Sequence, residues 1–385
     1  MVNGSVRRVP GMPLLLAMTV LGFSGYAALL AVAPLWAVHG GADAVGAGLV
    51  NGVLMLFTVL TQLFVPSALR RFGWGPVLVA GMLLLGLPAL ALGVSDALGP
   101  TLALSAVRGL GFGVLTVTGS ALVAELVEPQ RRGKAIGAYG LAIAGPQIVF
   151  LSAGPWIAEQ LGFRVVFAVA ALPALAAVPA IGLARMLDHV PEDVHERAPY
   201  ARLLPPMALL IGATLAGGAL ITFMAQMSSD AVLTALALLL MSVAAALARW
   251  RIGAWADRHG PHRFLAPLVL LTTAGMIVIA WAVRDPQATV APALMVGATM
   301  VGLSYGALQN LTLVVTFQTV SRQHYGPASA MWNIGFDAGT GVGAVVVGMV
   351  AAGTSFSTAL LVAGAISLLT LPLALGRRLP GARVS

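Results

Sequence analysis

The sequence contains no cysteine among its 385 residues, and only 9% of the residues are charged. The lack of cysteine excludes disulfides, thiolate metal sites and a cysteine nucleophile. The low charge excludes a soluble fold for the chain as a whole, because soluble domains carry about 25% charged residues. The sequence also has no Walker A loop and no HExxH segment. It therefore lacks the motifs of ATP hydrolysis and of zinc-dependent hydrolysis. We therefore expect no enzyme, no cofactor and no metal site.

Long apolar runs make up most of the chain. Hydrophobic residues account for 59% of it, and the mean hydropathy is +0.95. A spanning helix needs about 20 apolar residues, whereas a β-barrel strand alternates over about ten. The sequence therefore predicts an all-α integral membrane protein with twelve transmembrane helices, over Met12–Trp36, Val45–Leu69, Gly75–Leu92, Pro100–Val127, Ala135–Ile157, Val165–Met186, Leu204–Met227, Ala231–Ala248, Phe264–Val283, Thr289–Val320, Ala328–Ala352 and Thr358–Leu375.

The basic residues lie between the apolar runs and indicate topology rather than nucleic-acid binding. There are 21 of them, and the loops that follow odd-numbered spans hold only Arg164 and Arg284. Because basic residues gather on the cytoplasmic side, we expect both termini and the polar stretch His189–Arg202 to lie in the cytoplasm. The first apolar run is too long for the core of a signal peptide, so we expect it to be retained. The expected location is the inner or plasma membrane of the cell.

An internal repeat relates the two halves of the chain. Arg132–Gly145 can be aligned with Tyr325–Ala338 at a constant offset of 193. The offset matches residues of like kind, namely Gly133 with Gly326, Tyr139 with Trp332, Gly109 with Gly302 and Gly113 with Gly306. We infer two pseudo-symmetric six-helix bundles, at 1–188 and 203–385, joined by a cytoplasmic linker at 189–202. Duplicated bundles are typical of alternating-access carriers with a site at the bilayer midplane.

The segment between the eighth and ninth spans reads GAWADRHGPHR, with Gly253, Asp257, Arg258, Gly260 and Arg263 at fixed spacing. It resembles the GxxxDRxGxR loop of the major facilitator superfamily, in the position where that family carries it. A carboxylate at such a helix end can accept hydrogen bonds from the free N–H groups of a neighbouring helix N-terminus. We expect the segment to act as a conformational clamp; the alternative is that its charges only fix topology.

The corresponding loop of the first half, PSALRRFGWG, departs from this pattern. It keeps Arg71 and Gly73 but has Arg70 in the place of the aspartate and Pro66 in the place of the first glycine. A cation facing a helix N-terminus is unfavourable. We therefore expect a weaker clamp in this half, or one in which Glu125 or Glu128 pairs with neighbouring arginines, namely Arg70, Arg71, Arg131 or Arg132.

Two further segments resemble proton-coupled exporters of this superfamily. RGLGFG, beginning at Arg108, resembles the arginine–glycine segment of their fourth helix. The Gly-Pro pairs at Gly145 and Gly154 resemble the motif of antiporters, although they straddle its register. The resemblance implies export by proton antiport.

Arg108 and Asp337 are the two charged residues that fall well inside predicted spans. Each costs about 2.5–3.5 kcal/mol at the bilayer centre, so neither is expected to face lipid. Desolvation favours the neutral form of a carboxyl group, and a nearby cation favours the charged form. Asp337 is therefore the candidate proton carrier, and Arg108 its counter-ion or an anchor for an anionic group. The alternatives are a structural acid bonded to hydroxyls or Asn333, and an arginine bonded to backbone carbonyls.

Uncharged polar residues inside the spans extend the expected substrate pathway, each with bridging between helices as the alternative. They are Tyr26, Gln62, Gln147, Thr222, Gln226, Tyr305, Gln309, Asn310, Asn333 and Thr340. By contrast, the glycines at 109, 111 and 113 and at 335, 339 and 343 predict close helix packing.

These observations predict a secondary transporter that exports a small organic molecule in exchange for protons. The expected partners are that substrate, protons and the lipid bilayer, with no nucleic acid and a monomeric state. The alternatives are a proton-coupled uptake symporter and, from another class, a non-transporting membrane sensor. A sensor would require a polar output domain, which the segment after Leu375 does not supply.

Overall fold

The computed structural model describes residues 9–127, 132–187, 200–321 and 324–376. Throughout these ranges the chain is helical, with short connections. Twelve helices are long and apolar enough to cross a membrane, which confirms the predicted fold class and number of spans. The chain divides into two compact units, Met1–Gly41 with Val53–Glu192 and Ala42–Gly52 with Asp193–Ser385.

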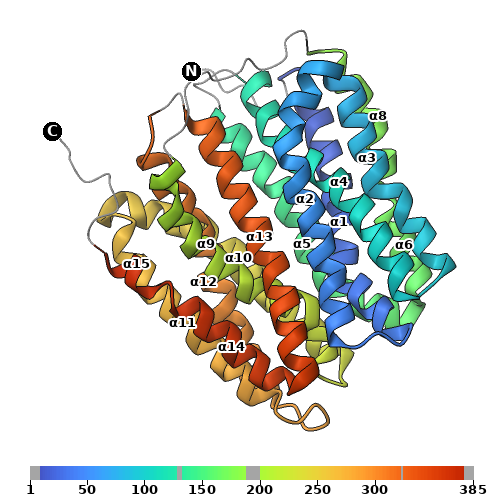
Figure 1. The fold of residues 1–385 in the computed structure, drawn as a ribbon. Coiled ribbons are helices and arrows are strands. Elements are labelled where there is room, and N and C mark those ends of the chain that lie inside the picture. Colours follow the sequence, from blue (N-terminus) through green and yellow to red (C-terminus); the bar gives the residue numbers. More distant parts are fainter. Residues whose placement is uncertain (1–8, 128–131, 188–199, 322–323, 377–385) are drawn as a thin grey trace. The chain divides into compact units, whose positions relative to one another are not determined.

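The first unit contains the helices coloured blue to green in Figure 1. They are α1 (Met12–His39), α2 (Ala44–Phe72, of which the part from Val53 on belongs to this unit), α3 (Trp74–Ala91), η2 (Leu92–Val94), α4 (Leu98–Leu126), α5 (Arg132–Leu161), α6 (Phe163–Ala170), α7 (Leu172–Leu175) and α8 (Ala177–Ala184). The sixth span is broken into three pieces, α6 to α8. Pro173 is the second residue of the middle piece, in the first helical turn, where a residue without an N–H is tolerated.

The second unit contains the helices coloured yellow-green to red in Figure 1. They are α9 (Tyr200–Phe223), η3 (Met224–Gln226), α10 (Ala231–His259), α11 (His262–Ala282), α12 (Ala291–Gln318), α13 (Tyr325–Gly353), α14 (Phe356–Leu368) and α15 (Leu371–Leu375). Helix α10 continues to His259, well past the Ala248 expected from the apolar run. It passes through Gly253 and ends where Gly260 adopts a positive φ of 81°. Arg249 therefore lies inside this helix rather than in a loop.

The first turns of α2 belong to the second unit, unlike the predicted bundle at 1–188. Gly48 lies against the Ala344 backbone and Gly52 against Val345, with no room for a Cβ atom. Asn51 Nδ2 donates a hydrogen bond to Thr222 Oγ1 over 2.9 Å. The predicted linker at 189–202 falls mostly outside the described residues.

Matching glycines bring matching helices together in the two units. Gly109 and Gly113 of α4 lie against the carbonyl oxygens of Leu54 and Thr58 in α2. At the positions 193 residues further on, Gly302 and Gly306 of α12 lie against the carbonyl oxygens of Met241 and Ala245 in α10. The packing role predicted for these glycines is confirmed, and in α13 Gly339 and Gly343 likewise lie against the backbone of α9.

The aromatic residues that the repeat aligns occupy matching places. The Tyr139 ring of α5 lies against Gly119 of α4. In the second unit, Trp332 Nε1 of α13 donates a hydrogen bond to Thr312 Oγ1 of α12 over 3.1 Å. Thr312 stands 193 residues after Gly119, as Trp332 does after Tyr139. The offset of 193 therefore relates residues that occupy equivalent positions in the two units.

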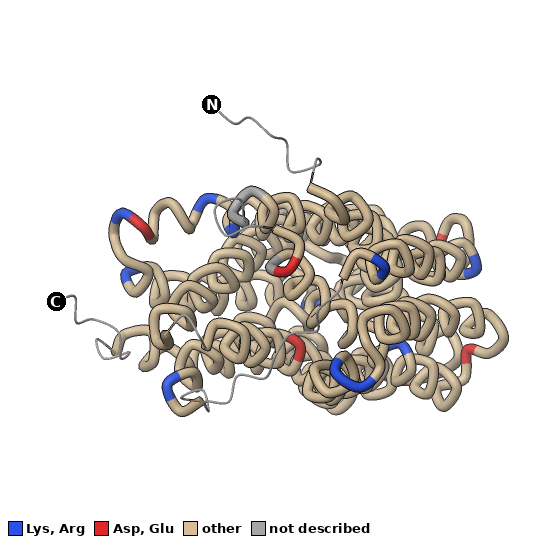
Figure 2. Tube along the Cα trace, turned by 90° about the horizontal axis from the view of Figure 1, so that it is seen from above, with Lys and Arg blue, Asp and Glu red and all other residues tan. Residues whose placement is uncertain are grey.

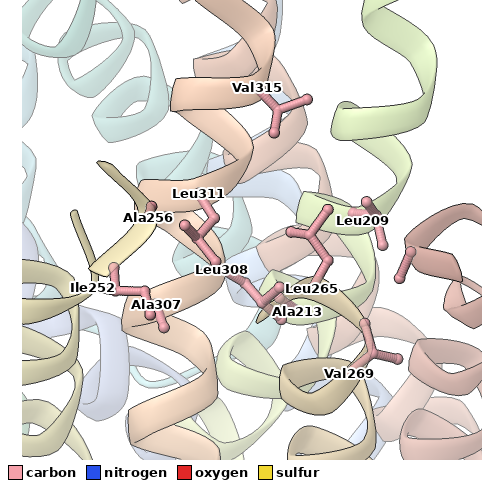
Figure 3. Close-up of a cluster of buried hydrophobic side chains, with 11 residues drawn as sticks. Leu209, Ala213, Ile252, Ala256, Leu265, Val269, Ala307, Leu308, Leu311 and Val315 are labelled. Carbon is pink, nitrogen blue, oxygen red and sulfur yellow. The ribbon is translucent and has the colours of Figure 1, made fainter. Parts of the chain in front are cut away.

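An apolar core holds α9 to α12 together near the C-terminal end of α10. Figure 3 shows Leu308 and Leu311 of α12 pointing toward Leu265 of α11 and Leu209 of α9. Ile252 of α10 belongs to the same cluster. Leu308 and Leu311 flank two polar residues of α12, at 309 and 310. Their contacts fix the rotation of α12 about its axis, and this rotation directs the two polar side chains toward α10.

Candidate functional site

The two motif loops make the same turn. Gly260 ends α10 with φ 81° and donates its N–H to Ala256 O over 2.8 Å. Gly73 follows α2 with φ 76° and donates its N–H to Leu69 O over 2.8 Å. Positive φ is disfavoured for residues with a Cβ atom, so both positions require glycine. Residues 69 and 73 correspond to 256 and 260 at an offset of 187.

The charged residues of the motif are exposed. Asp257, Arg258 and Arg263 form no ion pair with any described residue. Asp257 also makes no side-chain hydrogen bond within the described ranges, so the clamp stays a prediction. A Cβ atom at position 253 would lie 3.8 Å from Asn310 Nδ2 of α12, which is an ordinary contact distance. For the loop of the first unit, the pairing expected of Glu128 and Arg131 lies outside the described residues.

In the first unit, Arg108 lies about 15 Å along α4 from Leu98. It is 2% exposed, and its Nη2 donates to Gly25 O of α1 over 3.4 Å. Its buried Nε has no hydrogen-bond partner among the described residues. Tyr26, the next residue of α1, interacts electrostatically with Arg108 and stacks on Phe112 at 3.7 Å between ring centroids. The structure thus brings Tyr26 and Arg108 together, and it provides Arg108 with one backbone carbonyl as a hydrogen-bond acceptor.

Gln62 connects α2 to α4. Its Nε2 donates a hydrogen bond to Thr116 Oγ1 over 3.1 Å. Thr116 lies about 12 Å along α4 from Arg108. Gln147 is half-buried on α5. Gln62 therefore bridges helices, the alternative stated for these polar residues.

The second unit gathers a larger polar cluster at the middle of its helices. Arg249 Nη1 of α10 donates a hydrogen bond to Gln309 Oε1 of α12 over 3.2 Å. Tyr305, one turn away on α12, is hydrogen-bonded to the Gln309 side chain and interacts electrostatically with Arg249 and Asp337. Asn310 Nδ2 donates to Arg249 O over 3.0 Å. Helices α10, α12 and α13 thus each contribute to one polar layer.

Asp337 lies about 18 Å along α13 from Tyr325 and is 2% exposed. The Phe336 ring beside it lies 6.2 Å from the Tyr305 ring and 5.8 Å from the Trp332 ring. A carboxyl group is thus held inside the unit, within electrostatic range of the Tyr305 hydroxyl.

Several expected lining residues lie away from this cluster. Gln226 is in η3, beyond the end of α9, and its Nε2 donates to Thr222 O at the end of α9 over 3.4 Å. Thr340 Oγ1 donates to Phe336 O over 3.0 Å. Asn333 is half-buried, one turn before Asp337 on α13. Because Arg108 and Asp337 belong to different units, their pairing stays a prediction.

Arg249 is not predicted as a site residue from the sequence, because it directly follows the apolar run that ends at Ala248 and so belongs with the basic residues that indicate topology. The offset of 187 between the two motif loops contains the missing signal. With the offset of 187, Arg249 of α10 aligns with Gln62 of α2. With the offset of 193, Gln309 of α12 aligns with Thr116 of α4. The hydrogen bonds Gln62–Thr116 and Arg249–Gln309 are therefore equivalent, and the second unit carries a cation where the first carries an amide.

Figure 2 shows how sparse charged residues are along the helices. Among the described residues, Arg108, Arg249 and Asp337 combine a place deep within a spanning helix with contacts to neighbouring helices. Such residues are expensive in a membrane and mark functional sites.

Comparisons with known proteins agree with this architecture. The chain is similar to the D-xylose-proton symporter, at 12% identity, 99% coverage of this chain, 100% of the other and a TM-score of 0.76. It also resembles a bacterial homologue of the human lysosomal transporter Spinster in its inward-facing, occupied form, at 12% identity, 97% coverage of both chains and a TM-score of 0.76. These likenesses show the fold.

One curated relative is the probable 4-methylmuconolactone transporter of Cupriavidus pinatubonensis. It is 32% identical over 111 residues, which cover 27% of this chain and 26% of the relative. The match thus spans about a quarter of either protein. The sequence model described as Major Facilitator Superfamily matches twice, over residues 14–208 and 206–384, as expected of a duplicated chain. The protein belongs to the major facilitator superfamily.

Proposed function

We propose that this protein exports a small organic molecule in exchange for protons, by alternating access. Asp337 carries the proton, and the proton gradient is the energy source. Protonation of Asp337 from outside weakens its hold on a cation or on the substrate, the substrate leaves outward, and Asp337 releases its proton inward.

The observation that supports this proposal is the position of Asp337. It is the one carboxyl group among the described residues that lies buried at the middle of a spanning helix, and it interacts with the Tyr305 hydroxyl. A carboxyl group in such surroundings can exist neutral or charged, depending on its neighbours. A residue that alternates between these two forms can couple proton movement to a change of conformation.

The remaining parts of the proposal follow from the sequence. The resemblance of the Arg108 segment to exporters supports export, and the distribution of basic residues supports cytoplasmic termini in the cell membrane. We further propose that the protein acts as a monomer, without a cofactor, and that it has no enzymatic activity. The curated relative makes 4-methylmuconolactone the first compound to test.

The test is proton movement in liposomes that contain the full chain and a pH-sensitive dye. A panel of organic compounds that begins with 4-methylmuconolactone is added to the parent, to Asp337→Asn and to Asp285→Asn. Asp285 is an exposed loop carboxylate and serves as the control. We expect compound-dependent proton movement in the parent and in Asp285→Asn, and its loss in Asp337→Asn with retained substrate binding.

The direction of proton movement decides between exchange and co-transport. If protons and substrate move in the same direction, uptake by symport replaces export. If coupling persists undiminished in Asp337→Asn, Asp337 is a structural acid and another group, with Glu125 as the next candidate, carries the proton. Asp257→Asn in the same assay is expected to slow transport without abolishing coupling.

A further inference from the structure

We propose that Arg249 binds the carboxylate of the transported molecule, so that the substrate is a small organic acid. This inference rests on the proposed transport function and adds the chemical class of its substrate. It assigns the anion site to the second unit, at the hydrogen bond that joins α10 to α12.

The first argument is the lack of a counter-ion. A guanidinium group has five N–H donors. Arg249 uses one of them in the bond to Gln309 and forms no ion pair with any described residue. Intramembrane arginines are normally paired. An arginine with several donors to spare, held in place by a neutral acceptor, suits two-point binding of a carboxylate.

The second argument is access. Arg249 lies about 15 Å from His259 along α10, within a spanning helix. Its hydrogen bond to Gln309 is partly buried, but the residue keeps part of its surface exposed. A cation at this depth is not stable against lipid, so the exposed surface is expected to face water. Its contacts with Gln309 and Tyr305 show that the side chain is directed toward α12. A dissolved anion can therefore reach it.

The third argument is the chemistry of the surroundings. The Tyr305 and Gln309 side chains add polar groups beside Arg249, and the rings of Tyr305, Phe336 and Trp332 supply apolar surface. An acid with a hydrophobic body matches this combination better than an inorganic anion. Asp337 lies within electrostatic reach of Tyr305, so its charge and that of the bound acid influence one another.

The fourth argument is the charge of the helix interiors. Arg108 and Arg249 each lack an ion-pair partner among the described residues, while Asp337 is the one buried mid-helix carboxyl group there. Two cations and one acid leave a positive balance, which an anionic substrate neutralises. The equivalent of Arg249 in the first unit is the amide of Gln62, so the charge is not required to build this helix contact.

The experiment uses the full chain in phosphatidylcholine nanodiscs and calorimetric titration with benzoate and with benzamide, its uncharged counterpart. We expect benzoate to bind the parent, and benzamide to bind about tenfold more weakly or not at all. Arg249→Gln, which copies the first unit, is expected to lose about tenfold in benzoate affinity. Arg249→Lys keeps the charge, and its benzoate affinity is expected to lie between those of the parent and Arg249→Gln. This intermediate affinity separates the loss of charge from misfolding.

Arg251→Gln is the matched control. Arg251 lies two residues away, is exposed, and stacks on Trp250 at 4.8 Å. It should bind benzoate as the parent does. The proposal is overturned if benzoate does not bind the parent up to about 10 mM, or if Arg249→Gln binds it unchanged. Compound-dependent proton movement that survives in Arg249→Gln would leave the proposed transport function intact while removing the anion site.

A second measurement tests access alone. Because the chain has no cysteine, Arg249→Cys and Leu247→Cys each introduce a single thiol. Leu247 is 53% exposed on another face of the same helix and is expected to face lipid. A charged, membrane-impermeant thiol reagent should label Arg249→Cys and spare Leu247→Cys. Failure to label Arg249→Cys would contradict the proposal.

Discussion

Arg249 donates a hydrogen bond to Gln309 at the two positions that Gln62 and Thr116 occupy in the first unit. The helix contact is the same in both halves, but the second half has a cation in it. Duplicated bundles start from identical sites, so a difference at equivalent positions identifies where one half has acquired its own chemistry.

Gln309→Glu should weaken carboxylate binding. A glutamate at this position would form an ion pair with Arg249 and occupy the donors that the substrate needs. We expect benzoate affinity in nanodiscs to fall by about tenfold. Gln309→Met, which removes the acceptor without adding charge, should cost less. Equal affinities of the parent and Gln309→Glu would argue against an anion site at Arg249.

Gly306→Ala should destabilise the second unit. The new methyl group would overlap the Ala245 carbonyl oxygen on α10, and backbone cannot yield as a side chain can. Overpacking of this kind costs about 1–3 kcal/mol. Unfolding in detergent, followed by circular dichroism, measures the loss. Gly140→Ala on α5 is the control, because nothing lies within 4 Å of its added Cβ atom; a similar loss there would remove the packing explanation.

The glycines of the motif loop should differ in their tolerance. Gly260→Ala places a side chain at φ 81° and is expected to cost about 1–2 kcal/mol. Gly253→Ala adds a methyl group at ordinary contact distance from Asn310 and should be nearly neutral for folding. Thermal unfolding of the two variants makes the comparison. A stable Gly260→Ala protein would mean that the turn can be rebuilt without positive φ.

The aromatic residues aligned by the repeat should also differ. Trp332→Phe removes the donor to Thr312 and is expected to cost about 0.6 kcal/mol or more, the average for hydrogen bonds between membrane helices. Tyr139→Phe should be close to neutral, because the Tyr139 hydroxyl has no hydrogen bond to a described residue. Unfolding free energies of the two variants test this. A larger loss in Tyr139→Phe would contradict it.

Much of the architecture could be predicted from the sequence. The twelve spans follow from apolar length, because a bilayer requires it of any helix that crosses. The glycine pairs that bring α4 to α2 and α12 to α10 follow from the repeat. The membership of Arg249 in α10 did not follow, because the apolar run ends at Ala248, whereas the helix continues through polar residues to the positive-φ turn at Gly260.

The candidate site was predicted only in part. Tyr305, Gln309, Asn310 and Asp337 were expected to be functional, and they do gather around one layer of the second unit. Gln226 was expected there too but lies in η3 and donates a hydrogen bond to Thr222 of the preceding helix α9. Polarity within an apolar run indicates that a residue has a partner, and it does not indicate which partner.

The sequence by itself determined the class of this protein: a twelve-span, duplicated chain with the family's loop motif, since span length, repeat offset and residue spacing are properties of the chain alone. Only the tertiary structure decided that Arg249 is bound to Gln309 and that Asp337 is buried beside Tyr305. The physical reason is that these contacts join helices far apart in the sequence. The rotation of each helix about its axis, set by glycine contacts and the apolar core around Leu308 and Leu311, selects which polar side chains meet.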